Sequence, residues 1–185
     1  MRGLIFRSFQ DFIETRFSAE LLDATLSLDG LRSTDGAYTT VGDYPTGELV
    51  EMIGFVSAET STPANELIQA FGEYLFAVLA TAHSEIVTQF ESCFDLLAGI
   101  ETVIHKNVRK LYDRPELPTF DVLEHSGDRI LILRYSSPRP FADLAAGLIR
   151  GALAYYELEK SVDVQRKDLS DDGMNSEFHL TRKDA

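Results

Sequence analysis

The sequence predicts an α+β fold, in which a mostly helical N-terminal part precedes a small antiparallel sheet of about four strands. Apolar residues recur every three or four positions through the first two-thirds of the chain, as in amphipathic helices. Beyond Pro115 they form short strand-like segments that Gly-containing turns join in pairs, as in hairpins. No repeat or flexible linker divides the 185 residues, so we expect a single domain over residues 1–185.

Four amphipathic helices are expected in the first part of the chain. The first covers residues 4–17, and Ser18 is suited to cap the second, which Gly30 would end. Proline favours the first turn of a helix, so Pro45 and Pro63 mark the starts of the third and the fourth.

A further helical stretch of roughly residues 84–112 is expected to break near Ser92 or Gly99. The remainder is expected to form a strand pair, a helix and a second strand pair. The expected ranges are strands 120–123 and 129–135, a helix over 141–156, and strands 162–167 and 177–181.

The composition is that of a soluble globular protein, with 44% hydrophobic and 25% charged residues. A net charge of −13 repels phosphate backbones and anionic lipid, so neither nucleic acid nor a membrane is an expected partner. The lone Cys93 excludes an intramolecular disulfide and a multi-cysteine metal site, and its simplest role is that of a buried small hydrophobe. Charged residues interrupt the N-terminal apolar run, so we expect no signal peptide and a cytoplasmic protein.

Of the four histidines, His105 is the candidate metal ligand. His125 falls in a predicted turn, and His179 lies in a terminal strand where it faces solvent. His83 stands at the end of the fourth helix, where the helix dipole favours a protonated imidazole. We therefore expect structural roles for these three histidines. His105 lies within a helical segment, one turn after Glu101. Judged by spacing alone, a histidine at such a position is more often a core or boundary residue than a metal ligand.

A second candidate group ends the predicted strand 129–135. Ser137 and Arg139 each precede a proline, which favours extended backbone. Continued alternation would place Tyr135, Ser137 and Arg139 on one face and Arg134 on the other. A guanidinium and two hydroxyls suit a carboxylate-bearing ligand with an apolar body. A polar strand end with a solvated Arg139 is an equally good interpretation of these residues alone.

Five segments spread along the chain resemble those of a known family. They are Met1-Arg2-Gly3-Leu4-Ile5-Phe6, Ala70-Phe71-Gly72-Glu73-Tyr74, His105 followed by Val108-Arg109-Lys110-Leu111-Tyr112, the motif Tyr135-x-Ser137-x-Arg139, and Gly147-Leu148-Ile149-Arg150-Gly151-Ala152. The chain resembles the haem-nitric oxide/oxygen-binding (H-NOX) domains, which are related to the haem domain of soluble guanylate cyclase. The Y-x-S-x-R motif alone is weak, but its place after such a histidine makes the resemblance specific.

The resemblance implies a haem b cofactor buried between the helices and the sheet. His105 would be the proximal iron ligand, and Tyr135, Ser137 and Arg139 would bind the haem propionates. Pro118 takes the place of a family proline that presses on the haem and distorts it.

The resemblance also implies an apolar distal pocket formed by Ile5, Phe9, Leu75, Leu144 and Leu148. Leu144 stands where oxygen-binding members carry a tyrosine whose hydroxyl donates to bound oxygen. A pocket without a donor discriminates against oxygen, so the expected ligands are NO and possibly CO. Tyr74 adjoins Leu75, and a helix rotated by one residue would bring its phenol towards the ligand.

The family's mechanism implies a gas sensor rather than an enzyme. By this resemblance, NO binding would break the bond to His105, the haem would relax against Pro118, and the helix that carries His105 would move. A separate effector protein would read the moved surface, and family precedent suggests a histidine kinase or a cyclic-di-GMP enzyme.

Two other classes stay open at this point. One is a non-haem binding module of related fold, in which His105 is structural. The other is a haem enzyme such as a peroxidase, which normally needs a distal histidine or arginine for acid–base work. None of the assigned distal positions carries one.

Overall fold

The chain folds into a series of helices followed by an antiparallel sheet with one more helix, and the computed structural model describes residues 1–31, 33–34, 36–111 and 116–183. The helices are α1 (Gly3–Arg16), α2 (Ala19–Leu26), α3 (Thr46–Thr60), α4 (Ala64–Ala82), α5 (Ser84–Val87), α6 (Cys93–Ala98), the π-helical turn η1 (Ile100–His105), α7 (Lys106–Leu111) and α8 (Ala142–Tyr155). The strands are β1 (Thr119–Ser126), β2 (Ile130–Ser136), β3 (Val162–Asp168) and β4 (Asn175–Arg182). They pair in the order β1-β2-β4-β3, all antiparallel, which confirms the predicted α+β class and the four-stranded sheet.

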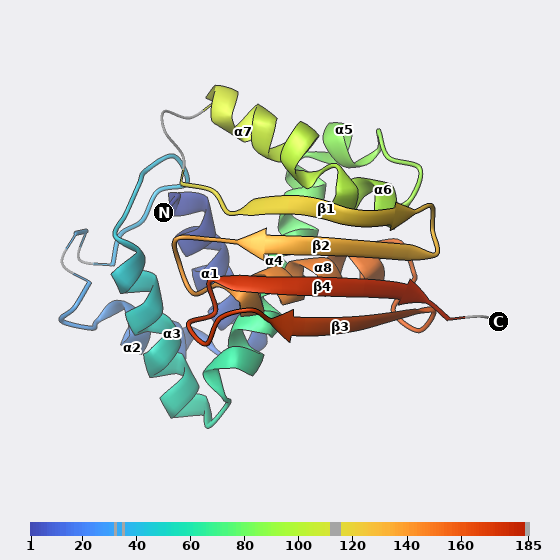
Figure 1. Ribbon diagram of the computed structural model, residues 1–185. Coiled ribbons are helices and arrows are strands. Elements are labelled where there is room, and N and C mark those ends of the chain that lie inside the picture. The colour runs from blue at the N-terminus through green and yellow to red at the C-terminus, as the bar shows by residue number, and fades with distance from the viewer. Residues whose placement is uncertain (32, 35, 112–115, 184–185) are drawn as a thin grey trace.

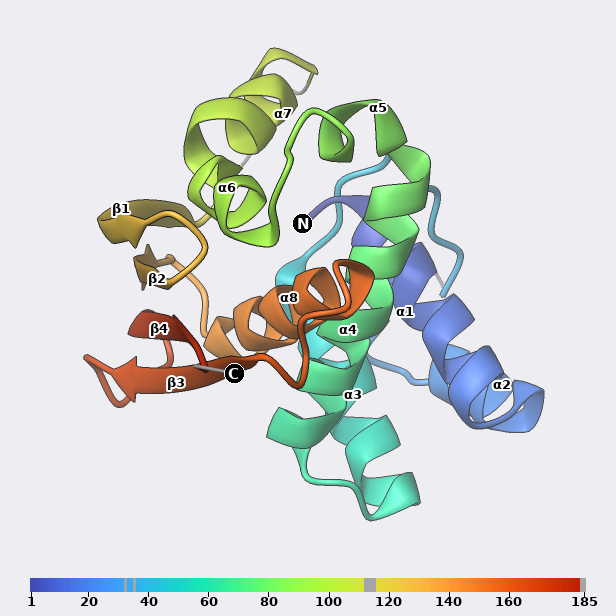
Figure 2. The ribbon, with the colours of Figure 1, turned by 90° about the vertical axis from the view of Figure 1, so that its right-hand side faces the viewer.

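The elements form successive layers (Figures 1 and 2). The sheet lies on one side, α8 crosses α4 behind it, and α1 and α2 lie beyond α4 on the far side. Helix α3 contacts α4 and lies below α8 in the view of Figure 2. Helix α6 and the π-turn η1 contact β1 at the edge of the sheet, whereas α5 continues from the end of α4, away from the sheet in Figure 2. The N-terminus lies beside the beginning of β1.

Helix α2 ends at Leu26, earlier than the predicted end at Gly30. The hydroxyl of Ser27 donates to the backbone carbonyl of Asp23 at 2.8 Å, so a side chain satisfies one of the carbonyls at the end of the helix. The start is as predicted, because the Ser18 hydroxyl accepts from a backbone N–H in the first turn.

The stretch predicted over residues 84–112 is divided at both of the proposed places. Ser92 caps α6, and Gly99 separates α6 from η1. The π-helical geometry of η1 was not predicted, because apolar spacing does not distinguish a π-turn from an α-turn. Tyr112, where this stretch was expected to end, lies outside the described residues.

Two apolar clusters form the core, and α8 lies between them. We call one the helical cluster; it gathers buried side chains of α1, α3 and α4, among them Phe9, Phe71 and Leu75. The other, the sheet cluster, gathers side chains of the sheet, α6 and α8, among them Tyr135 and Phe178.

Helices α4 and α8 approach each other through backbone rather than through side chains. A Cβ added at Gly147 would lie 2.2 Å from the carbonyl oxygen of Gln69 and 2.8 Å from the Cα of Gly72. Only glycine fits such a crossing, which explains physically why the two motif segments that contain Gly72 and Gly147 carry small residues.

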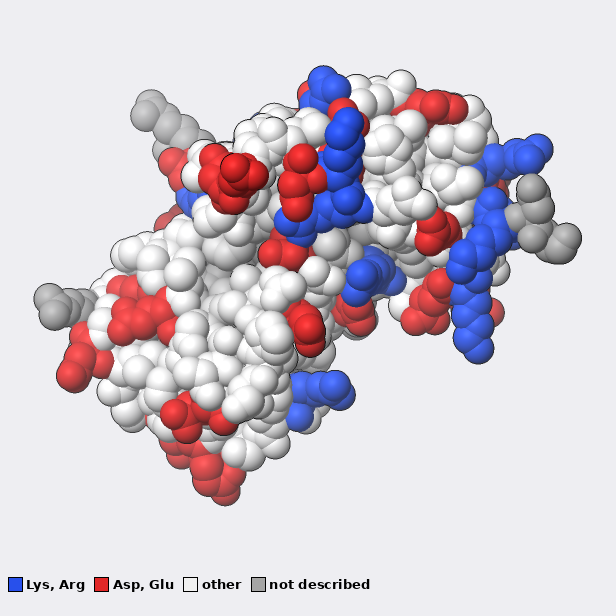
Figure 3. Space-filling view, turned by 60° about the horizontal axis from the view of Figure 1, so that its bottom comes forward, with Lys and Arg blue, Asp and Glu red and all other residues white. Residues whose placement is uncertain are grey.

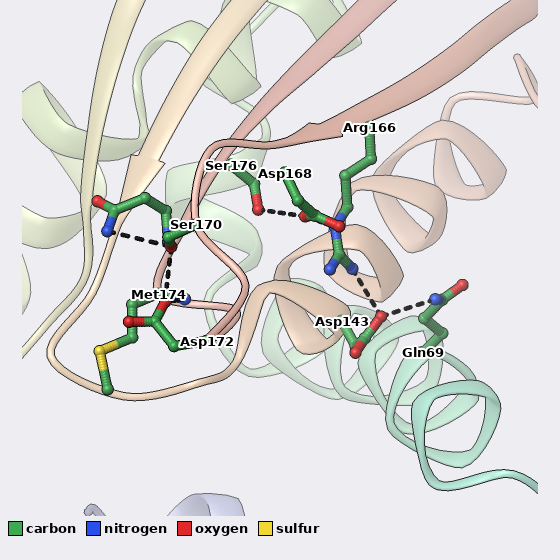
Figure 4. A network of polar contacts seen from close by, with 9 residues as sticks. Gln69, Asp143, Arg166, Asp168, Ser170, Asp172, Met174 and Ser176 are labelled. Atoms are coloured by element: carbon green, nitrogen blue, oxygen red, sulfur yellow. Dashed lines mark hydrogen bonds and ion pairs between the residues drawn. The ribbon is translucent and has the colours of Figure 1, made fainter.

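A chain of polar contacts ties α4, α8 and the sheet together (Figure 4). Asp143, in the first turn of α8, accepts from Gln69 of α4 at 3.0 Å and from Arg166 of β3 at 2.6 Å. Arg166 also donates to Asp168, which accepts from the buried Ser176 at 2.8 Å. The position of α8 relative to its two neighbouring layers is thus fixed by hydrogen bonds as well as by packing.

Charge is unevenly spread over the molecule. Arg32 is the only Lys or Arg between Arg16 and Lys106, a stretch rich in Asp and Glu. In Figure 3 acidic side chains dominate the lower left of the face shown, and most Lys and Arg side chains lie towards the upper and right-hand parts. Within the described ranges, no helix combines the length and the apolar character needed to cross a membrane.

Candidate haem site

His105 lies at the end of η1 with its ring mostly buried. The π-turn begins at Gly99, whose carbonyl oxygen accepts from the N–H of Val103 at 2.9 Å and from that of Ile104 at 3.4 Å. Only 12% of the His105 side chain is exposed, and its ring centroid lies 5.9 Å from that of Phe120 on β1. The helix and the sheet edge therefore enclose this imidazole from two sides.

The electrostatic surroundings of His105 keep it neutral. Burial lowers the pKa of the imidazole most strongly, and the cationic Arg109 lowers it further. The carboxylate of Glu101 and the backbone of Pro118 act in the opposite direction without outweighing burial, so the net shift is downward. A neutral imidazole is the form that can donate a lone pair to a metal.

Pro118 lies just before β1, with its backbone close to the imidazole of His105. It is partly buried, whereas the segment 112–115 that leads towards it lies outside the described residues.

Tyr135 leaves β2 towards the interior. It is 2% exposed and lies on the same buried face of the strand as Leu131 and Leu133. Burial raises the pKa of its phenol, whereas hydrogen bonding to Ser137 and the nearby Arg166 and Arg139 act in the lowering direction. A protonated phenol in these surroundings is a hydrogen-bond donor at neutral pH.

Ser137 and Arg139 reach the same place by a different backbone route from the one predicted. β2 ends at Ser136, so the strand alternation does not continue beyond it. Instead the N–H of Ser137 donates to the Met174 carbonyl at 2.9 Å, and the N–H of Arg139 donates to the Ser137 hydroxyl at 3.1 Å. This turn still brings Ser137 and Arg139 close enough to Tyr135 to influence its pKa.

The side chain of Arg139 is only 20% exposed, and its guanidinium pairs with the carboxylate of Glu116. It donates to the backbone carbonyl of Glu116 at 3.0 Å and also to its carboxylate. The N-terminal amino group lies nearby, since Arg139 is among the charges that lower the pKa of Met1 after burial. Five guanidinium donors leave room for a further anionic ligand at this end of the site.

The five residues expected in the distal pocket meet in the helical cluster. Phe9 and Leu75 are fully buried there, and Ile5, Leu144 and Leu148 pack against it with partial exposure. The turn that follows Arg139 leads to Phe141, another member of this cluster. The Tyr135–Arg139 segment thus passes from the sheet cluster to the helical cluster.

Tyr74 faces away from its buried neighbour Leu75. Its ring packs on Phe12 with a centroid distance of 5.6 Å, and it lines a surface hollow together with Ala77 and Val78. The phenol of Tyr74 therefore lies in the contact between α1 and α4 and at the outer surface.

The other three histidines have structural surroundings. His83 is the C-cap of α4, at the end of that helix as predicted, and its side chain is exposed. His125 lies at the end of β1 rather than in the turn, with its ring 3.5 Å from Asp95. His179 on β4 is half-buried beside Glu177 at 3.3 Å.

The donor set of this region fits haem. It offers one neutral imidazole, an apolar wall of aliphatic and aromatic side chains, and a guanidinium with two hydroxyls suited to carboxylates. Across the part of the chain that the structure describes, no three His, Cys, Asp or Glu side chains come together as a protein-only metal site. A single histidine is what a protein contributes when a porphyrin supplies the other ligands.

The fold and this site define the class of the protein, a haem-binding gas-sensor domain. The chain belongs to the HNOB family, described as Haem-NO-binding, which matches residues 2–164. Its cofactor is accordingly haem. Among curated proteins no relative matches the chain.

Solved structures of H-NOX proteins are similar over the full length. The Fe(II) unliganded H-NOX protein of K. algicida superposes with a TM-score of 0.90 at 28% identity, covering 100% of this chain and 98% of that one. The H-NOX protein of S. oneidensis in the Fe(II)NO ligation state gives a TM-score of 0.86 at 26% identity, with 100% of both chains covered. The IWP-051-bound H-NOX of Shewanella woodyi in the Fe(II)CO ligation state gives 0.82 at 36% identity, covering 99% of this chain and 95% of that one.

Three groups around the site were not singled out from the sequence. Glu101 contacts His105, Glu116 holds Arg139, and the Met1 amino group lies close to Arg139. The spacing of Glu101 four residues before His105 was visible, and helix geometry could have indicated that contact. The contacts of Glu116 and of the Met1 amino group with Arg139 join segments that are distant in sequence, so no local sequence pattern predicts them.

Proposed function

We propose that this chain binds haem b through His105 and senses NO, with CO as a second ligand and with discrimination against oxygen. The main support is His105 itself, a mostly buried and neutral imidazole beside Pro118 in a chain of the haem-NO-binding family. Ferrous haem, when bound, would supply the iron chemistry that binds a diatomic gas. His105 would hold the iron, and Tyr135, Ser137 and Arg139 would hold the propionates.

The relatives support the choice of gases. The S. oneidensis protein was solved in an Fe(II)NO state and the S. woodyi protein in an Fe(II)CO state. We infer the same two ligands for this chain, because its expected distal residues are aliphatic or aromatic and present no hydrogen-bond donor.

Discrimination against oxygen would follow from that absence of a donor. Bound oxygen is polarised and gains stability from a hydrogen bond, whereas NO and CO gain less. We expect Leu144→Tyr to introduce such a donor and to give measurable oxygen binding in air-equilibrated buffer. Leu148→Phe, which adds bulk without a donor, is the matched control. If oxygen binding stays absent with tyrosine at 144, that residue does not line the ligand position.

Signalling would run through release of His105. The residue ends η1, which joins α6 to α7, so a change at the imidazole is transmitted directly to these helices. Pro118 would restrain the haem until His105 dissociates from the iron. A separate effector protein, a histidine kinase or a cyclic-di-GMP enzyme, would read the altered surface.

The first test is an anaerobic absorption spectrum of the reduced, haem-loaded protein before and after NO, beside a sample in air. A five-coordinate ferrous spectrum that shifts with NO and is unchanged by oxygen is expected. His105→Gly should lose this spectrum and regain it with added imidazole. Stable oxygen binding would overturn the distal assignment, and failure to take up haem would favour the non-haem module with a structural His105.

A further inference from the structure

Glu101 is the only acidic side chain on η1, and it contacts the imidazole of His105 one turn away. Its Oε2 lies 2.9 Å from Nδ1 of His105, and both side chains are mostly buried. The other carboxylate oxygen, Oε1, accepts from the guanidinium of Arg109 on α7. One carboxylate is therefore shared between an imidazole and a cation.

The protonation states follow from these contacts. The guanidinium of Arg109 donates to this carboxylate, and such a charge-assisted contact favours the ionised form of Glu101. An ionised carboxylate has no proton to give, so Nδ1 of His105 must be the donor in this contact. The neutral tautomer with its proton on Nδ1 leaves the lone pair of Nε2 free.

A carboxylate that accepts from a ligand histidine does two things to a metal site. It fixes the ring orientation and tautomer, and it makes the coordinating nitrogen more basic. The ring of Phe120 packs near the imidazole, and the Pro118 backbone is close to it. Glu101 is the anionic group in hydrogen-bond contact with this ring among the described residues.

We propose that Glu101 is a positioning residue for His105, one that orients Nε2 towards the iron and strengthens the bond it forms. Arg109 moderates this effect, because it withdraws part of the negative charge from the same carboxylate. This inference rests on the proposed role of His105 and adds a residue pair that sets how firmly the imidazole is held. A firmly held, more basic imidazole would stabilise ferric iron and would resist release when NO binds.

Two substitutions are expected to act in opposite directions on the reduced, haem-loaded protein. Glu101→Gln keeps an acceptor for Nδ1 but removes the charge, so the iron–histidine stretching frequency in resonance Raman should fall and the reduction potential should become more positive. Arg109→Gln leaves the carboxylate to His105 alone, so both quantities should shift the other way. Equal values for wild type and both variants would overturn the role of Glu101.

Glu177→Gln is the matched control. Glu177 on β4 also shares its carboxylate between an arginine and a histidine, Arg134 and His179, at 2.9 and 3.3 Å. The substitution disturbs a similar pair away from η1, so the Raman frequency and the potential should equal those of the wild type. A shift as large as that of Glu101→Gln would mean that general charge, not contact with His105, is responsible.

A binding measurement separates this inference from the proposed function. In a His105→Gly background, free imidazole should occupy the place of the side chain, and adding Glu101→Ala should weaken its binding about tenfold. If imidazole changes nothing in His105→Gly itself, the assignment of His105 is wrong. If imidazole binds equally with and without Glu101, the assignment of His105 stands and the role of Glu101 is refuted.

Discussion

Two arginines near the end of β2 differ in what their guanidinium groups contact. Arg139 is mostly buried at the site and bonds to Glu116, whereas Arg134 is half exposed and pairs with Glu177 on the neighbouring strand. A hydrogen bond to a charged group contributes about 1.5–3 kcal/mol. We therefore expect Arg139→Ala to lose haem about tenfold faster or more, measured as transfer of haem to apomyoglobin.

Arg134→Ala serves as the control for this experiment, since it removes the same charge from the same segment of chain. Its haem loss should match that of the wild type. Equal acceleration by both substitutions would mean that the total charge of the sheet, and not a contact of Arg139, retains the haem.

Cys93 is expected to be inert in the folded protein. It is fully buried at the start of α6, and burial raises the pKa of its thiol to about 12, with the nearby Asp128 carboxylate acting in the same direction. The reactive thiolate is then negligible at pH 8. Ellman's reagent should leave the native protein unlabelled and react fully in guanidinium chloride. Rapid labelling of the native protein would show that α6 opens readily.

At the scale of elements, the α4–α8 crossing depends on the absence of side chains. Gly147→Ala places a Cβ within 2.2 Å of the Gln69 carbonyl oxygen, so the helices must separate. Overpacking of this kind costs about 1–3 kcal/mol, and we expect a lower thermal midpoint. The displaced α8 carries Leu144 and Leu148, so CO binding to the haem-loaded variant should change as well.

Gly54, in the middle of α3, provides the contrast. An added Cβ there meets nothing within 4 Å. Gly54→Ala should raise stability by about 0.5–1 kcal/mol, because alanine loses less backbone entropy in a helix. A similar loss of stability in both variants would show that the Gly147 effect is not steric.

Local rules predicted the elements with one face towards the core. The apolar spacing and the prolines gave α1, α3 and α4, and the turn glycines gave both hairpins, with Gly127 and Gly173 at positive φ. The end of α2 and the π-turn were missed. Both depend on which donor each backbone carbonyl accepts from, and the spacing of apolar residues does not predict these hydrogen bonds.

The site was predictable where one segment supplied the chemistry. Five consecutive positions contain Tyr135, Ser137 and Arg139, so these residues stay close together in the structure. This holds even though β2 ends at Ser136 and a turn replaces the expected extended backbone. The contact of Arg139 with Glu116 joins residues distant in sequence, and only the fold brings them together.

For the molecule as a whole, acid stability is expected to depend on Glu48. Its carboxylate accepts from Ser33 N–H and hydroxyl at 2.9 and 2.7 Å and from the Tyr38 hydroxyl at 2.7 Å. Burial opposes ionisation, but these hydrogen bonds outweigh it, so the pKa of Glu48 lies below its ordinary value of 4.5. A depressed carboxyl pKa stabilises the fold above the unfolded value, and this stability is lost as pH falls through the folded value.

The free energy of unfolding should therefore decrease as pH drops below about 4.5. Glu48→Gln should lower it by about 1–3 kcal/mol at neutral pH and flatten the dependence on acid. Urea unfolding at a series of pH values measures both effects. Parallel curves for the two proteins would show that other carboxyl groups govern acid unfolding.

The uneven distribution of charge also gives the molecule an electrical orientation. Residues 1–105 carry nearly all of the net negative charge, because acidic and basic residues almost balance in residues 106–185. A charged partner therefore exerts a torque as well as an attraction, and turns the helical end towards a basic surface before contact. At physiological salt the field decays over about 8 Å, so this alignment takes place only in the last stage of approach. Raising the ionic strength would remove the alignment while leaving every contact of the final complex in place.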